Sequence, residues 1–319
     1  MRKASYAEII LVVFGSLTLM LGSLVVHYRA LAQAGSSGLQ SIFDRNVEFI
    51  TDFYGFRYRG VSNNFVDAHI LYFGAYEKPL LYWLRDTAAL LQDEGLVFLD
   101  IGANTGQHSL FMSKLLAEVH AFEPYPPILE RLNYSVNFNS LTNVFIHPVG
   151  LGAENETLAF FEPPPDNQGT GSFARGLQDR SPGTTNLEIA RGDDYLPAHG
   201  VERVDLVKID VEGYEKNVLT GLAKTIERER PILVVEVTVS RSADELFKSQ
   251  NELKAAFPDN YDFAVMPDEF TEEQLLSGAY EITPFGPTSP SFLFDSQWTV
   301  IAFPAEKSAA ISRSGGSGD

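Results

Sequence analysis

Residues 97–106 constrain the fold more than any other part of the chain. They begin with a continuous apolar run that only Asp100 interrupts, as is typical of a central strand in a parallel sheet. Gly102 and Gly106 follow, and residues 109–116 have the spacing of a helix. A buried strand, a glycine turn and a helix in this order predict half of a βαβ unit whose turn approaches a ligand.

The rest of the chain continues this alternation. Further strands are predicted at residues 119–122, 144–149, 204–209, 231–237, 261–266 and 298–303, with helices at 127–137 and from about 211 to 226. The pattern predicts an α/β fold with a doubly wound, mostly parallel sheet. Between residues 157 and 191 the alternation of strands and helices is interrupted. The prolines and glycines there predict a β-hairpin excursion with a mobile loop.

The glycine turn distinguishes between nucleotide ligands. A dinucleotide site requires a second glycine that admits a pyrophosphate, and Asn104 stands there instead. Glu123 ends the next strand, where a carboxylate accepts hydrogen bonds from both hydroxyls of a ribose. These features favour S-adenosylmethionine, which has no phosphate and whose cationic end an acid attracts. The predicted cofactor-binding residues of this half are Asp100, Gly102, Ala103, Asn104, Gly106 and Glu123.

A second motif lies at the end of the strand 204–209. Asp210 and Glu212 follow that strand at the carboxyl edge of the sheet, where open α/β sheets bind ligands. We expect both to flank the methyl donor and to be the candidates for a general base, with Asp210 also contacting the cofactor. The alternative for Asp210 is a helix N-cap, which is compatible with ligand contact. His108, His147 and His199 are weaker candidates for the base.

These strings resemble the FkbM-type methyltransferases. The resemblance rests on LDIGANTG at 99–106, FEP at 122–124, VDLVKIDVEGYE at 204–215 and RPILVVEV at 230–237. It implies a class I methyltransferase fold with a seven-stranded sheet, an antiparallel last strand, and O-methylation of sugars or small metabolites. It also implies that Glu77, of the Tyr76-Glu77 pair, and Gly150, near the adenine, bind the cofactor, and that Gly171-Ser172 forms a small-residue loop.

The N-terminal residues 9–26 form an uncharged apolar run. As a helix it is about 27 Å long, close to the hydrocarbon thickness of a bilayer. We expect residues 1–33 to be a retained single-pass transmembrane anchor, and a cleaved signal peptide with an Ala30-Leu31-Ala32 site is the alternative. Thr18 and Gly22 share a helix face that suits contact with other transmembrane helices. The side of the membrane on which the main domain lies stays open. The charges of Arg2 and Lys3 favour a domain outside the cell, whereas a cofactor made in the cytosol favours a domain inside it.

The remaining segments complete the domain organisation. Residues 34–94 are expected to be a linker and a mostly helical N-terminal cap, residues 95–304 the FkbM-like domain, and residues 305–319 a disordered tail. The net charge of −18 opposes binding to nucleic acid. The chain has no cysteine, and no cluster has the spacing of a metal site, since Asp193-Asp194 fits a helix start better than a metal pair.

Three functions remain at this point. The first is a methyltransferase that acts on a sugar, lipid-linked or other small-molecule hydroxyl at a membrane. The second is a methyltransferase fold that serves as a non-catalytic accessory subunit of a membrane complex, although a scaffold has no physical need for Glu123 beside the glycine turn. The third is a nicotinamide-dependent dehydrogenase, which Asn104 opposes.

Overall fold

The computed structural model describes residues 47–164, 170–173, 181–239, 246–266, 274, 278, 282–284 and 296–308. The chain divides into two compact units, one made of the residues up to 76 and one that begins at residue 77, with 165–169 grouped with the first. The predicted transmembrane anchor at 1–33 and the residues after 308 lie outside the described part. Within the described part, every helix is too short or too polar to span a bilayer.

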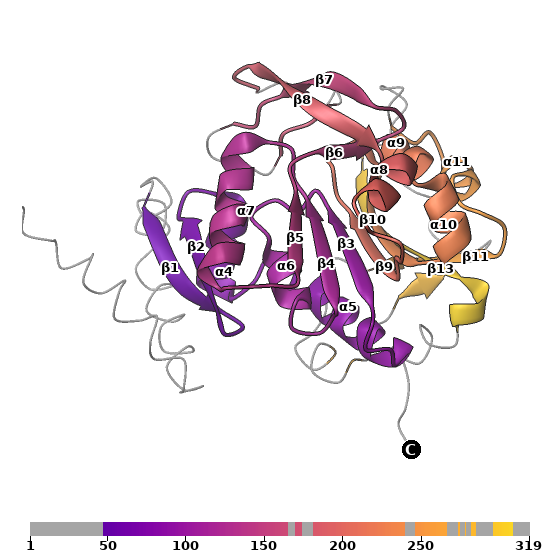
Figure 1. The fold of residues 1–319 in the computed structure, drawn as a ribbon, viewed down its shortest axis with the longest axis horizontal. Coiled ribbons are helices and arrows are strands. Elements are labelled where there is room, and N and C mark those ends of the chain that lie inside the picture. The colour runs from indigo at the N-terminus through magenta and orange to yellow at the C-terminus, as the bar shows by residue number, and fades with distance from the viewer. Residues whose placement is uncertain are drawn as a thin grey trace, which may run out of the picture. The chain divides into compact units, whose positions relative to one another are not determined.

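Residues 47–76, the described part of the first unit, form a β-hairpin followed by a helix (Figure 1). Strands β1 (Glu48–Phe53) and β2 (Phe56–Val61) pair antiparallel, and helix α4 (Phe65–Phe73) follows them. The expected mostly helical cap did not include this hairpin, whereas α4 and a second helix at Lys78–Leu91 lie within its bounds. The sequence carries a strand signal for the hairpin, because Phe49 and Phe53 alternate with exposed residues and Tyr54-Gly55 has the two positive φ angles of a tight hairpin turn.

The second unit is built on a mixed sheet. Its strands are β3 (Val97–Ile101), β4 (Glu118–Phe122), β5 (Val144–His147), β9 (Leu206–Ile209), β10 (Ile232–Val239), β11 (Tyr261–Met266), β12 (Thr283–Pro284) and β13 (Ser296–Pro304). In the described residues they lie in the order β12-β11-β13-β10-β9-β3-β4-β5. The strands from β10 to β5 are parallel, and β13 inserts antiparallel between β10 and β11. This confirms the mostly parallel sheet with an antiparallel last strand, and the short β12 makes eight strands rather than seven.

The two faces of this sheet differ in character. The helices of the unit are α5 (Lys78–Leu91), α6 (Gln107–Met112), α7 (Pro126–Phe138), α8 (Gly192–Ala198), α9 (Glu215–Gly221), α10 (Ala223–Glu229) and α11 (Gln250–Ala255). On one face Leu99, Val207 and Val235 pack with Leu219 and Ile226 of the later helices into the main apolar core. The strand residues between them point to the opposite face, because side chains alternate along a strand.

The insert forms a small sheet of its own. Strands β7 (Glu156–Phe161) and β8 (Thr184–Arg191) form an antiparallel pair, and β6 (Gly150–Gly152) lies parallel to β8. The predicted β-hairpin excursion is confirmed. The greater part of the expected mobile loop lies outside the described residues.

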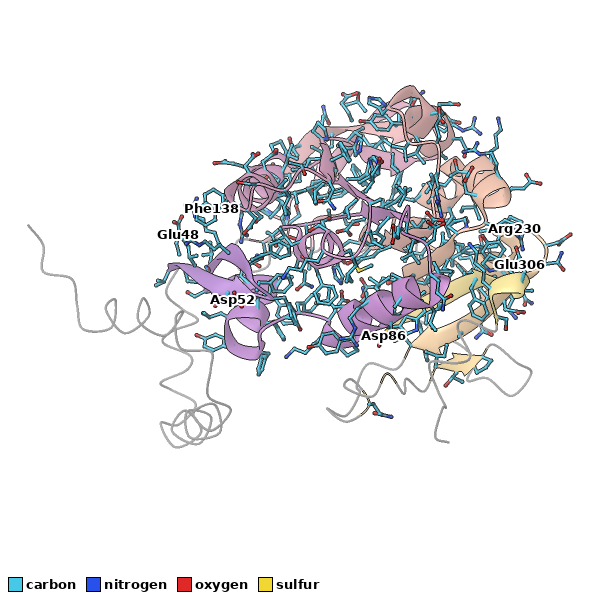
Figure 2. The ribbon with its side chains drawn as sticks, turned by 60° about the horizontal axis from the view of Figure 1, so that its bottom comes forward. Glu48, Asp52, Asp86, Phe138, Arg230 and Glu306 are labelled. Carbon is cyan, nitrogen blue, oxygen red and sulfur yellow. The ribbon has the colours of Figure 1, made fainter. Side chains whose placement is uncertain are left out.

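The described chain ends in a short 3₁₀ turn at Ala305–Lys307, which the prediction of a disordered tail from residue 305 did not include. Two contacts order these residues. Arg230, which precedes β10, points toward Glu306 (Figure 2), and its Nε lies 2.5 Å from a carboxylate oxygen. The Lys307 ammonium donates to the Arg230 carbonyl at 2.6 Å. The end of β13 is thereby tied to the start of its neighbour.

Candidate functional site

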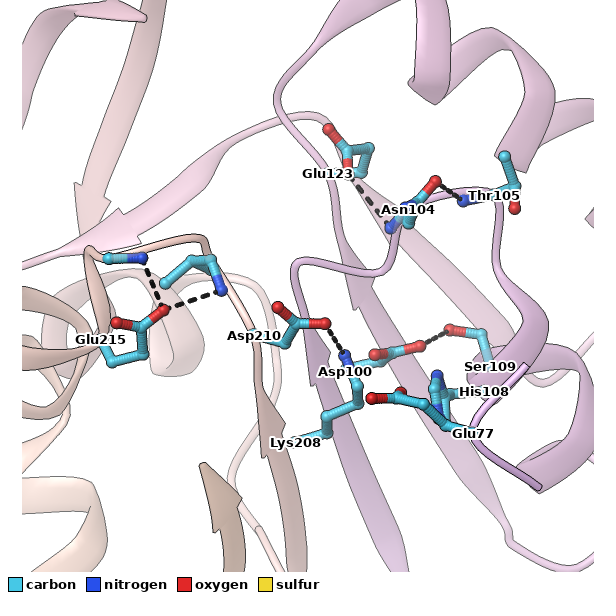
Figure 3. Close-up of polar contacts among 12 residues, drawn as sticks. Glu77, Asp100, Asn104, Thr105, His108, Ser109, Glu123, Lys208, Asp210 and Glu215 are labelled. Atoms are coloured by element: carbon cyan, nitrogen blue, oxygen red, sulfur yellow. Dashed lines mark hydrogen bonds and ion pairs between the residues drawn. The ribbon is translucent and has the colours of Figure 1, made fainter. Parts of the chain in front are cut away.

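Polar side chains gather on one face of the sheet, at the carboxyl ends of its central strands (Figure 3). Asp100 of β3 lies beside Lys208 of β9, and Glu236 of β10 lies beside Thr299 of β13. Lys208 pairs in register with Val234, so Glu236, two residues further on, lies alongside Asp210 on the same face. Strand register therefore brings both predicted motifs into one site.

Asp100 is completely buried in this site. One carboxylate oxygen accepts a hydrogen bond from the Ser109 hydroxyl of α6 at 2.6 Å, and the other oxygen has no partner among the described residues. Burial raises the pKa of Asp100, although the nearby Lys208 ammonium opposes the shift. A buried acceptor without a donor is costly, so a ligand that donates to it binds favourably.

The two motif turns are in direct contact at Gly102. A Cβ atom at this position would lie 1.8 Å from the carbonyl oxygen of Asp210, and the φ angle of Gly102 is +79°. Only glycine satisfies both conditions. Asn104 in the same turn also has a positive φ of 52°, and its side chain accepts a hydrogen bond from the amide of Thr105 at 2.8 Å. This strained turn keeps the backbone close to where a ligand lies.

Glu123 lies at the end of β4, next to that turn. One of its oxygens accepts from the backbone N–H of Asn104 at 3.1 Å and the other from that of Tyr125 at 2.9 Å. Burial raises the pKa of Glu123 to about 7, and the two backbone donors oppose the shift. Each carboxylate oxygen has a second lone pair, so both can still accept from a ribose hydroxyl. Gly150 lies beside Pro124, the residue after Glu123, since a Cβ there would come within 3.5 Å of the proline ring.

Lys208 is the buried cation of the site. Its Nζ lies 2.9 Å from a carboxylate oxygen of Asp210, and only 5% of its side chain is exposed. Burial opposes a charged lysine, but Asp210, Asp100 and Glu77 outweigh it and raise the pKa of Lys208. Burial also opposes ionisation of Asp210, and Lys208 outweighs it, so the pKa of Asp210 lies below its ordinary value. The pair is therefore ionised at neutral pH.

A small pocket of about 10 Å³, room for about one water molecule, lies beside this pair. It is lined by Glu77, Leu80, Lys208, Ile209, Asp210, Val234, Glu236 and Thr299. Glu236 is hydrogen-bonded to Asp210, and burial together with the Asp210 charge raises the pKa of Glu236 well above its ordinary value. Ionisation of Glu236 is therefore strongly opposed beside the Asp210 carboxylate.

Glu77 faces His108 across the same pocket region. A carboxylate oxygen of Glu77 and Nε2 of His108 are 3.5 Å apart, and neither atom has a hydrogen bond within the described chain. Burial raises the pKa of Glu77 to about 7 and lowers that of His108 well below its ordinary value. Glu77 has a φ of +45° at the start of α5, and its side chain lines the pocket. His108 is therefore neutral.

Glu212 has a different position from Asp210. Its φ angle is +52°, and its carbonyl accepts a hydrogen bond from the buried Ser172 hydroxyl of the insert at 2.5 Å. Burial, followed by the charge of Asp210, raises the pKa of Glu212 to about 8. Glu215 holds the same turn, because it accepts from the N–H groups of Val211 and Gly213 at 3.2 and 2.9 Å. The turn that carries Glu212 is thus fixed from two sides.

The other histidines lie away from this site. His147 ends β5 on the face of the sheet that carries the apolar core, and it contacts His120 at 3.0 Å and the Tyr195 hydroxyl at 3.3 Å. Burial lowers the pKa of His147 to about 4. His199 is exposed and stacks on Tyr195. Neither histidine reaches the pocket that Asp210 lines.

The predicted helix start at Asp193-Asp194 is confirmed by α8, whose first turn contains both residues. Among the residues that the structure describes, no group of three or more histidine, aspartate or glutamate side chains has the arrangement of a metal site.

Three polar residues of the site were not predicted from the sequence. Lys208, Glu236 and Thr299 line the pocket. The signal for the first two is a charged residue within an otherwise apolar strand, a combination that has a high desolvation cost and so indicates a partner or a ligand. Thr299 has no such signal, because only the insertion of β13 beside β10 places it there.

S-adenosylmethionine fits the donors and acceptors of this site. The unpaired oxygen of Asp100 can accept from its ammonium group, and Glu123 can accept from its ribose. The N–H groups of Gly102 and Ala103 both donate to the Phe122 carbonyl, which holds the turn against the end of β4 beside these acceptors. The acids Glu77, Asp100 and Asp210 attract the positive charge of a sulfonium.

Similarity to known proteins leads to the same site. The model of the methyltransferase FkbM domain matches residues 100–272. The chain is 27% identical over 173 residues to the hexuronic acid methyltransferase AglP of Haloferax volcanii, which covers 53% of this chain and 69% of the relative. It is also 27% identical over 185 residues to the 2-O-methyltransferase NoeI of Sinorhizobium fredii, covering 54% of this chain and 73% of the relative.

Among solved structures, the chain resembles a methyltransferase FkbM from Methylobacillus flagellatus at 16% identity, with a TM-score of 0.39. The likeness covers 66% of this chain and 44% of the length of the solved protein. The match to the family model is the stronger finding, because it spans both motif turns and more than half of the 319 residues. The chain belongs to the FkbM family of S-adenosylmethionine-dependent methyltransferases.

Proposed function

We propose that this protein transfers a methyl group from S-adenosylmethionine to a hydroxyl of a sugar or of another small molecule. The observation that carries the proposal is the pocket in which the Asp210 carboxylate, held by Lys208, lies beside the cofactor turn. Two relatives support the class of acceptor, since one is described as a hexuronic acid methyltransferase and the other as a 2-O-methyltransferase.

The residues of the site have separate tasks in this proposal. Asp100, Glu123 and the turn at Gly102 hold the cofactor, which supplies an electrophilic methyl group when bound. Asp210 is ionised and takes the proton of the acceptor hydroxyl as a general base. Lys208 holds the Asp210 carboxylate in place. Alignment of the acceptor oxygen with the methyl group then accounts for much of the rate.

Two measurements test this function. Calorimetry with the full-length chain should show binding of S-adenosylmethionine, and Asp100→Asn should weaken it. Incubation with S-adenosylmethionine carrying an isotopically labelled methyl group and a panel of methyl glycosides should give labelled O-methyl sugars, and Asp210→Asn should abolish them. Absence of cofactor binding would favour the accessory-subunit function. Label recovered on nitrogen rather than oxygen would contradict the proposed acceptor.

We further propose that residues 1–33 anchor the protein in a membrane. The support is the uncharged apolar run at residues 9–26, together with the basic residues on either side of it. The full-length chain should stay in the membrane fraction after a high-salt wash, and a chain that begins at residue 34 should not. N-terminal sequencing of the mature protein separates an anchor, which is retained, from a signal peptide cleaved after Ala32.

A further inference from the structure

The pocket beside the cofactor turn contains more acids than one cation can balance. Of the described residues that line it, Glu77, Asp210 and Glu236 are acidic and Lys208 is the only basic one. Asp100 adds a fourth carboxyl, because it lies directly beside Lys208 in the strand register. Four ionised carboxylates around one ammonium would repel each other strongly in a poorly solvated space. At least one of these acids therefore holds a proton in the ligand-free protein.

The contacts identify Glu236 as the acid that holds it. Asp210 lies between two donors, the Lys208 ammonium at 2.9 Å and the Glu236 carboxyl. Burial raises the pKa of Glu236 well above its ordinary value, and the charges of Asp210, Glu77 and Glu212 raise it further. The neighbour of Glu236 on β13 is the uncharged Thr299. No cation other than Lys208 lines the pocket among the described residues, so the carboxyl is protonated at neutral pH.

A bound cofactor changes this charge balance. S-adenosylmethionine carries one positive charge more than S-adenosylhomocysteine, because the sulfonium becomes a neutral thioether when the methyl group leaves. The unpaired, fully buried oxygen of Asp100 can accept from the ammonium group that both ligands share, and the sulfonium, only three carbons away in the same molecule, then lies near the cluster of Asp100, Lys208 and Asp210. A second cation at this place stabilises one further carboxylate.

We propose that Glu236 releases its proton when S-adenosylmethionine binds, and that the pair Asp210–Glu236 recovers a proton from the acceptor hydroxyl during methyl transfer. This inference rests on the proposed function. In the transfer, a C–O bond forms to the acceptor oxygen while the S–C bond breaks, and its electron pair goes to sulfur. The O–H proton passes to the carboxylate pair. The site thus loses one positive charge at sulfur and gains one as a proton, so its net charge stays constant.

The test counts protons rather than product. Binding enthalpies of S-adenosylmethionine and S-adenosylhomocysteine to the full-length chain are measured at pH 7 in buffers with different ionisation enthalpies. The slope of the observed binding enthalpy against the ionisation enthalpy of the buffer gives the number of protons released on binding. We expect S-adenosylmethionine to release close to one proton more than S-adenosylhomocysteine. By linkage, its affinity should rise by up to about tenfold for each pH unit relative to that of S-adenosylhomocysteine.

Two variants make the test specific. Glu236→Gln keeps the shape and a hydrogen-bond donor to Asp210 but cannot ionise, so the difference in protons released should fall to nearly zero while both ligands still bind. Glu227→Gln removes an exposed carboxyl of α10 and should leave the difference unchanged. Equal proton release by the two ligands in the unmodified chain would overturn the proposal, and so would an unchanged difference in Glu236→Gln.

The outcomes also separate this inference from the proposed function. Failure of both ligands to bind would contradict the function itself, and the inference with it. Binding of both with equal proton release would contradict the inference alone. If Glu236→Gln does not fold, as judged by circular dichroism, the unmodified chain still decides through the affinity ratio of the two ligands between pH 6 and 8. A ratio that does not change with pH overturns the proposal.

Discussion

At the scale of single residues, the site depends on backbone conformations that side chains rarely adopt. Glu77, Asn104 and Glu212 have φ angles of 45°, 52° and 52°, and Gly102 has one of 79°. The conformations of Glu77, Asn104 and Glu212 cost free energy unless surrounding contacts compensate for it, whereas glycine adopts a positive φ without strain. All four residues lie in the turns or the helix start near the pocket.

Gly102→Ala tests this arrangement. The new Cβ would lie 1.8 Å from the carbonyl oxygen of Asp210, so one of the two motif turns must move. Gly200 is the matched control, because its φ is +78° but a Cβ there would have no atom within 4 Å. In urea unfolding, Gly200→Ala should cost about 1–2 kcal/mol from the backbone alone. Gly102→Ala should cost clearly more and should abolish cofactor binding; equal costs would contradict the steric argument.

At the scale of secondary-structure elements, the insert holds the second motif turn. Ser172 forms an antiparallel bridge with Phe161 of β7, and its hydroxyl donates to the Glu212 carbonyl. Phe173 packs on Tyr214, with 5.1 Å between ring centroids. A segment distant in the sequence therefore fixes the turn between β9 and α9.

Ser172→Ala should consequently weaken cofactor binding without unfolding the protein. Loss of one buried hydrogen bond costs about 1 kcal/mol, which corresponds to roughly a fivefold rise in the Kd of S-adenosylmethionine. Ser181→Ala is the control, because the exposed Ser181 also donates its hydroxyl to a backbone carbonyl, that of Gly183, at 2.6 Å. Calorimetry should show no change in this control. The same affinity in both variants would show that the insert does not position the turn.

Helix α10 depends on a cap from another helix. The carboxylate of Asp193 in α8 accepts from the backbone N–H groups of Lys224 and Thr225 at 3.1 and 2.9 Å, and from the Thr225 hydroxyl at 2.9 Å. Asp193→Ala should therefore lower the free energy of unfolding by about 1–2 kcal/mol. Asp194→Ala, one residue along, should have a much smaller effect in the same denaturation experiment. Equal effects would assign the loss to the first turn of α8 rather than to the cap of α10.

At the scale of the whole molecule, buried acids make stability depend on pH. Burial raises the pKa values of Glu77, Glu123 and Glu215 to about 7 and that of Glu212 to about 8. In the unfolded chain these groups ionise at ordinary values. As the pH rises toward and through the folded values, the unfolded state binds fewer protons than the folded state, and stability falls.

The melting temperature of the ligand-free chain should therefore fall between pH 6.5 and pH 8. Protonation of His147 does not contribute in this window. Burial lowers the pKa of His147 to about 4, so this residue destabilises the folded state only when the pH falls below the ordinary pKa of histidine. Thermal unfolding followed by circular dichroism checks the prediction. Glu212→Gln should reduce the slope at the upper end of the window, and a melting temperature that rises across the window would contradict the ionisation argument.

Much of the second unit follows from local sequence patterns. Apolar runs identified the strands of the sheet, and the turn at 102–106 with Glu123 identified the ligand, because these signals depend on neighbours along the chain. The hairpin at 48–61 was missed because aromatic residues obscured its period of two, although Tyr54-Gly55 is a recognisable turn. The roles of the predicted site residues stay predictions until variants are measured.

The sequence by itself determined the strand–turn–helix unit, the glycines that its turn requires and the acid that follows the next strand. Only the tertiary structure decided which acids meet. Asp100 lies on β3, Glu236 lies on β10 and Asp210 directly follows β9, so their approach depends on the register of these three strands. Register is a property of pairing between distant segments, and no local pattern encodes it. The shared proton of Asp210 and Glu236, and the single buried ammonium of Lys208, exist only because that pairing brings them together.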